Sequence, residues 1–64
     1  MRYRVWCDVT ALSKCKRWES KAVNAPTPEA AMEKVKKLFE EDGYEAVPVK
    51  AFRIADDGSE NNVH

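Results

Sequence analysis

Residues 27–43 read TPEAAMEKVKKLFEEDG and predict an α-helix with both of its ends marked. Thr27 is a good N-cap, and Pro28 suits the first helical position because its missing N–H is not needed there. Glu29 adds negative charge where the helix dipole favours it. Gly43 can adopt the left-handed conformation just past the last turn. We therefore expect the rest of the chain to form a sheet that packs against this helix.

One side of the expected helix is apolar, because nonpolar residues recur at positions i, i+4, i+7 and i+8. The members of this stripe are Ala31, Val35, Leu38 and Phe39. Leu38 and Phe39 are the largest of them, so these two side chains should join the helix to the sheet. Lys36, Lys37 and Glu40 should face water.

Length and charge exclude several classes of protein. The 64 residues suffice for one small domain, and a domain of this size buries only about 60% of its unfolded surface. Eleven basic residues balance eleven acidic ones, so no overall field attracts nucleic acid. No apolar run approaches the roughly 20 residues that cross a bilayer, and residues 1–6 lack the apolar segment of a signal peptide. We expect a cytoplasmic protein.

The first strand is expected over residues 2–10, where polar and apolar residues alternate. One face of this strand holds Tyr3, Val5, Cys7 and Val9, and it should pack against the helix. The other face holds Arg2, Arg4, Trp6 and Asp8. Residues 10–14 have no periodicity, which predicts the connection of a β-hairpin.

A second strand is expected over residues 15–25, although its two apolar sets are out of phase. Val23 and Ala25 lead into the helix and should face the core. Trp18 then faces the opposite side of the sheet, unless a bulge near Ser20 resets the register.

A third strand is expected over residues 45–55, and its alternation changes phase between Ala51 and Phe52. This change indicates either a bulge or a strand that is apolar on both sides. Pro48 cannot donate to a ladder, so it should lie on an edge strand or on the unpaired side of this strand. Residues 56–64 are polar and acidic, which predicts a disordered tail.

The order of these elements is β-β-α-β, which predicts an α+β fold in a single domain over residues 1–55. Strands two and three should run parallel because a helix connects them, and strand one fits between them, antiparallel to both. The expected architecture is a three-stranded sheet in the order 2-1-3 with one helix packed on one face.

Side chains suited to catalysis are few. The only histidine, His64, falls in the expected tail, and Cys7 and Cys15 match no metal-binding spacing. Cys15 lies beside the basic residues Lys14 and Lys16, a setting in which reactive thiols occur, so an enzyme that uses Cys15 is the third-ranked hypothesis. We predict no catalytic, cofactor-binding or metal-binding residues.

The sheet face away from the helix is the predicted functional surface, because one helix covers only one face. Exposed tryptophan beside arginine indicates self-association, a protein partner or a stacking platform for single-stranded nucleic acid. Alternatively, one or both tryptophans pack at the edge of the core. Zero net charge favours protein contact, with a homodimer as one form of it and nucleic acid as the alternative partner. The predicted partner-binding residues, which belong to this face and to the basic hairpin, are Arg2, Arg4, Trp6, Lys16, Arg17 and Trp18.

The strand-to-helix junction also carries a resemblance. The run VNAPTPEAAMEKV, residues 23–35, follows a first strand that contains Tyr3-Arg4-Val5. With this junction, residues 2–54 resemble short phage- and plasmid-encoded proteins of the DpnD/PcfM-like type, in which a Val-x-Ala strand end meets a Ser/Thr-x-Glu-Ala helix start. The two tryptophans and two cysteines depart from that pattern. The resemblance implies a small accessory protein without defined catalytic residues that binds proteins, for example as an inhibitor of a larger host protein. No site residues carry over.

Overall fold

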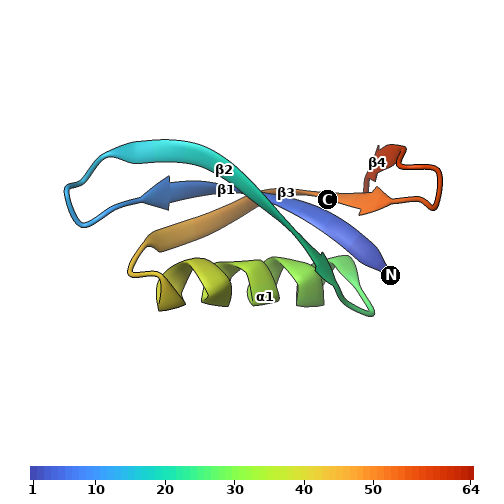
Figure 1. Ribbon diagram of the computed structural model, residues 1–64, viewed down its shortest axis with the longest axis horizontal. Coiled ribbons are helices and arrows are strands. Elements are labelled where there is room, and N and C mark those ends of the chain that lie inside the picture. Colours follow the sequence, from blue (N-terminus) through green and yellow to red (C-terminus); the bar gives the residue numbers. More distant parts are fainter.

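The computed structural model describes residues 1–64 and contains four strands and one helix (Figure 1). The strands form one antiparallel sheet in the order β2-β1-β3-β4, and the helix packs on one face of it. The α+β class and the central position of the first strand are confirmed, and the expected count of three strands is corrected to four. The elements are β1 (Arg2–Thr10), β2 (Lys16–Asn24), α1 (Pro28–Glu41), β3 (Glu45–Ile54) and β4 (Glu60–Asn62).

The start of α1 follows from its first residues. Thr27 has extended backbone, and its Oγ1 accepts a hydrogen bond of 3.1 Å from the Ala30 amide. Pro28 occupies the first turn, and Glu29 is the acidic residue of that turn. The cap satisfies one of the helix's unpaired amides, so the helix begins where the sequence predicts.

The end of α1 is a Schellman motif. Gly43 has a φ of +88°, and its amide donates to the Glu40 carbonyl at 3.0 Å. The Tyr44 amide donates to the Phe39 carbonyl, also at 3.0 Å. Phe39 is buried and Tyr44 packs against the same core, so the motif includes its usual apolar contact. The helix is too short and too polar to cross a membrane.

The core lies between α1 and the face of the sheet beneath it. Tyr3, Val5, Cys7 and Val9 are all buried, which confirms the predicted inner face of β1. The buried residues of α1 are Ala31, Val35 and Phe39.

Leu38 is only half-buried, so its predicted role as a main link to the sheet is wrong. It lies about 60° around the helix from Val35, on one flank of the stripe. Met32 lies on the opposite flank and packs against the core. The helix is therefore rolled so that Phe39 alone supplies the large side chain at its C-terminal end.

The pairing of β1 with β2 is regular along its whole length. Asp8 is opposite Trp18, and Arg4 is opposite Ala22, so Trp18 lies on the face away from the helix, as predicted. Val23 is opposite Tyr3 and packs against the core. No bulge resets β2 near Ser20.

The pairing of β1 with β3 contains the one irregularity of the sheet. Trp6 is opposite Lys50 and Cys7 is opposite Pro48, which leaves Val49 as an extra residue. This bulge is the first of the two explanations offered by the change of phase. It allows Ala46 and Ala51 to be buried under the helix although one is even-numbered and the other is odd-numbered.

Pro48 has no backbone N–H, and no neighbouring strand lies on the outer side of β3 at this position to accept one. Strand β4 pairs only with Phe52–Ile54, so β3 is an edge strand at the proline. The prediction that Pro48 lies on an unpaired side is confirmed.

The last residues form a hairpin, and the expectation of a disordered tail over residues 56–64 is corrected. The Ala55 amide donates to the Ser59 carbonyl at 2.8 Å, and Gly58 has a φ of +88°. Asp57 Oδ1 accepts hydrogen bonds from the amide and the hydroxyl of Ser59. An Asp-Gly turn with a left-handed glycine is a strong hairpin signal, and it returns the chain along β3 as β4.

Candidate functional site

The face of the sheet opposite α1 is called here the open face, because no helix or strand packs on it (Figure 1). Cross-strand partners share a face, so the registers define its members. They are Arg2, Arg4, Trp6, Asp8 and Thr10 of β1, Lys16, Trp18, Ser20, Ala22 and Asn24 of β2, Glu45, Val47, Lys50, Phe52 and Ile54 of β3, and Glu60 and Asn62 of β4.

The two tryptophans lie together on this face. Trp18 is opposite Asp8 and therefore diagonal to Trp6, a spacing within reach of two indole rings. The ring centroids are 5.7 Å apart and the ring planes differ by 12°, so the rings stack. Trp18 is 47% exposed, whereas Trp6 is half-buried. The pair forms a rigid aromatic surface across β1 and β2.

Arg4 connects three strands across the open face. Its Nε donates to Glu60 Oε2 of β4 at 3.1 Å, and its Nη1 donates to Ser20 Oγ of β2 at 3.3 Å. The side chains of Arg4 and Glu60 are 35% and 33% exposed, so water screens this pair and its energy is small. The main effect of these two hydrogen bonds is to orient the Arg4 guanidinium beside the tryptophan pair.

Apolar side chains continue the surface onto β3. Val47 is 62% exposed, and Phe52 and Ile54 are half-buried. On this face aromatic and aliphatic side chains alternate with charged ones, a mixture that occurs on surfaces that bind another macromolecule.

The structure brings together five of the six predicted partner-binding residues, namely Arg2, Arg4, Trp6, Lys16 and Trp18. The sixth, Arg17, lies on the opposite face because it is opposite Val9. There its guanidinium pairs with Glu19 at 3.1 Å and lies 5.6 Å from the centre of the Tyr44 ring. Arg17 is therefore not part of the open face, since adjacent residues of a strand point to opposite sides.

Sequence reasoning missed the contribution of β3 and β4 to this face. Val47, Lys50 and Phe52 share it only because the bulge at Val49 shifts the strand by one residue. The change of phase near Ala51 signalled such a shift but not its position. The sequence does not place Glu60 on this face, because the polar composition of residues 56–64 predicts a tail and not a hairpin.

The cysteines do not form a reactive pair. Cys7 is fully buried, and this burial, with the nearby negative charge of Asp8, raises the pKa of its thiol above the ordinary value of 9.0. Cys15 is exposed in the hairpin loop after Lys14, which has a φ of +64°. No three His, Cys, Asp or Glu side chains converge in a way that could hold a metal ion.

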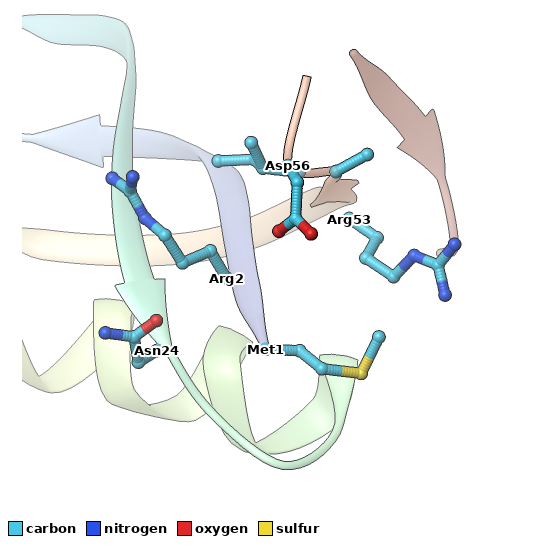
Figure 2. Close-up of a pocket in the computed structure, with 7 residues that line it drawn as sticks. Met1, Arg2, Asn24, Arg53 and Asp56 are labelled. Carbon is cyan, nitrogen blue, oxygen red and sulfur yellow. The ribbon is translucent and has the colours of Figure 1, made fainter. Parts of the chain in front are cut away.

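An open hollow of about 540 Å³ lies at one end of the sheet, lined by Met1, Arg2, Asn24, Arg53, Ile54, Ala55 and Asp56. Figure 2 shows the Asp56 carboxylate between Arg2 and Arg53, with both guanidinium groups directed away from it. The charged groups diverge, so the hollow lacks the convergent polar groups of a ligand site.

These features define a small α+β domain with one covered and one open sheet face. No family model, curated protein or solved structure matches the chain. The open face and its geometry are therefore the basis for a functional proposal.

Proposed function

We propose that this protein is a non-enzymatic binding module that contacts a protein partner through its open face. The observation that carries the proposal is the exposed stack of Trp6 and Trp18, beside an arginine held in place by Glu60 and Ser20. Tryptophan and arginine are the residues that most often dominate the energy of protein interfaces. A preorganised pair of rings loses little conformational entropy on binding.

The charges of the open face support a protein partner over a nucleic acid. Asp8 and Glu60 lie among the basic residues, and Glu60 neutralises Arg4. The indoles also stack on each other, which leaves fewer free ring faces for bases than two separate tryptophans would present. Charges of both signs among aromatic and aliphatic side chains suit contact with a protein surface.

The mode of action that we propose is to cover a surface of a larger protein. This is the action implied by the resemblance to small accessory proteins of phages and plasmids, some of which inhibit a host protein. A chain of 64 residues with a single open face is suited to such a role, because its binding surface is a large share of the molecule.

The test is affinity capture from the native host with matched variants. Trp18→Ala removes the exposed member of the stack, and Leu12→Ala removes an apolar side chain at the hairpin tip that is 92% exposed. We expect the unmodified protein and Leu12→Ala to retain one and the same partner, and Trp18→Ala to lose it. Circular dichroism must show that both variants are folded. Equal capture by all three proteins would contradict a role for the open face.

A nucleic-acid partner is the second candidate, because Arg2, Lys16 and Lys50 lie on the same face as the tryptophans. It predicts binding to single-stranded oligonucleotides that weakens steeply with salt, since each phosphate contact releases counterions. Titration of the protein with oligonucleotides at low salt, with Trp fluorescence as the signal, distinguishes a nucleic-acid partner from a protein partner. Tight, salt-sensitive binding that Trp18→Ala abolishes would replace the protein-partner proposal.

A further inference from the structure

Strand β2 forms one edge of the sheet, and its outer side has no partner strand. The Ala25 amide donates to the Met1 carbonyl at 2.8 Å, and the Ala11 amide donates to the Cys15 carbonyl at 3.1 Å. Both bonds join odd-numbered residues, and the pairing between them is regular. The backbone groups of odd-numbered residues of β2 therefore bond to β1, and those of even-numbered residues point away from the sheet. The open groups belong to Lys16, Trp18, Ser20 and Ala22.

The helix leaves this edge accessible along most of its length. The contacts of α1 are chiefly with β1 and β3, and Figure 1 shows β2 curving away from it toward the first hairpin. Only the Asn24 carbonyl is occupied, by Lys34 Nζ at 3.1 Å. An edge strand with unpaired amides and carbonyls is a template for another strand.

Natural edge strands often carry lysine to prevent such pairing, so the positions of the charges decide the outcome. Strand β2 runs from residue 16 to residue 24, and Ser20 is its central residue. An antiparallel pair of β2 strands related by a two-fold axis at Ser20 sets Glu19 of each copy opposite Lys21 of the other. Glu19 and Lys21 point their backbone groups inward, so they form the close, non-hydrogen-bonded type of pair.

Neighbouring registers are less favourable. A two-fold axis at Glu19 places two glutamates opposite each other, and an axis at Lys21 does the same with two lysines. An axis at Trp18 or Ala22 avoids these clashes but pairs fewer residues of the strand. In the register centred on Ser20, the bulky Trp18 is opposite the small Ala22 of the other copy. The indole ring therefore meets no large side chain across the new strand pair, and the open face of each copy stays exposed.

We propose that β2 pairs with β2 of a second copy of this chain, about a two-fold axis at Ser20, to form one continuous sheet. The axis is perpendicular to the sheet, so the two helices lie on one side and the two Trp6–Trp18 stacks lie on the other. The outward amides of Trp18, Ser20 and Ala22 each gain a free carbonyl acceptor. This dimer goes beyond the proposed function, because it requires no contact made by the open face.

The test is charge reversal at the paired positions, read as molar mass by analytical ultracentrifugation. The unmodified protein should show twice the monomer mass of 7.3 kDa at high concentration. Glu19→Lys and Lys21→Glu should each weaken dimerisation about tenfold or more, because each variant places like charges opposite each other twice. The double variant E19K/K21E should dimerise again, and an equimolar mixture of the two single variants should form the heterodimer.

Two further variants separate this dimer from other assemblies. Ser20→Pro removes an outward amide without removing a hydrogen bond to β1, so it should yield a folded monomer. Trp6→Ala is the matched control on the open face and should leave the mass of the dimer unchanged. A monomeric unmodified protein at millimolar concentration overturns the proposal. The proposal is also overturned if Trp6→Ala dissociates the dimer and the charge reversals at Glu19 and Lys21 leave it intact. Capture of a protein partner through Trp18 is a separate readout, so either proposal can fail alone.

Discussion

The two faces of the sheet are built from the same strands, yet they differ in what they contact. Beneath α1, the side chains of Tyr3, Val5 and Val9 are almost completely buried, and their neighbours across the core are Val35 and Phe39. On the open face, the corresponding positions carry long aromatic and charged side chains that keep part of their surface in water. The comparison indicates that the covered face provides most of the stability, whereas the open face is free to serve binding.

The boundary between the two faces is less sharp at β2. Three of its helix-side residues, Arg17, Glu19 and Lys21, are charged, and two of these lie over aromatic rings at the edge of the core. Lys21 Nζ is 4.9 Å from the centre of the Phe39 ring, and Arg17 covers Tyr44. Long basic side chains can cover apolar surface while their charges stay in water. Arg17 and Lys21 therefore cover the edge of the core where β2 curves away from the helix.

The largest expected effect is on the covered face. Phe39→Ala should lower the free energy of unfolding by about 3–5 kcal/mol, because it removes the one large helix side chain that fills the core. A domain of this size has roughly that much stability in total, so the variant should be largely unfolded. Thermal melts monitored by circular dichroism provide the measurement. Lys37→Ala, at an exposed position of the same helix, is the control, and equal melting temperatures would show that Phe39 does not support the core.

Leu38→Ala tests how far the covered face extends around the helix. Leu38 is half-buried on the flank of the stripe, so its truncation should cost about 1 kcal/mol, well below the cost at Phe39. Urea denaturation of the two variants side by side measures the difference. A loss at Leu38 as large as that at Phe39 would mean that the helix is rolled toward Leu38.

The exposed tryptophan should matter less for stability. Trp18→Ala removes a stacked ring that is 47% exposed, and we expect a loss of about 0.5–1.5 kcal/mol with a folded product. Denaturation followed by the fluorescence of Trp6 measures the stability. Complete unfolding of this variant would show that the open face is part of the core, and would remove the contrast between the two faces.

A smaller effect is expected at the edge of the open face. Glu60→Gln removes the ion pair with Arg4, which is partly exposed, so stability should change by less than about 1 kcal/mol. The local consequence should be fraying of β4. The Val63 amide, which donates to the Ala51 carbonyl at 2.9 Å, should exchange its hydrogen faster while the core amides stay protected. Unchanged exchange at Val63 would mean that the hairpin turn alone holds β4.

Chemical labelling of the two cysteines compares a buried position with an exposed one, and it requires no change of stability. Cys15 is exposed and should react with iodoacetamide in the native protein, without a change in melting temperature. Cys7 is buried, and the raised pKa of its thiol keeps it in the unreactive protonated form, so it should react only after unfolding. Mass spectrometry counts the labels. Two labels on the folded protein would show that the covered face opens readily.

The parts of the fold that depend on local interactions could be predicted from the sequence. Thr27, Pro28 and Gly43 mark the ends of α1 through backbone preferences that neighbouring residues alone satisfy. The alternation over β1 specifies both of its faces, because a strand has a period of two. These predictions gave the order of the first three strands and placed Trp6 and Trp18 on one surface.

Only the tertiary structure decided the features that depend on distant partners. The bulge at Val49 arises because Ala46 and Ala51 must both face the helix, and no local signal fixes where the extra residue lies. The Asp-Gly turn before β4 is a local signal, but the pairing of β4 depends on the exposed edge of β3 and on the contact of Glu60 with Arg4. By itself, the sequence determined the helix and the two sides of its central strand, since these rest on contacts between near neighbours. The composition of the open face depended on registers between strands, which are set only when all four pack together.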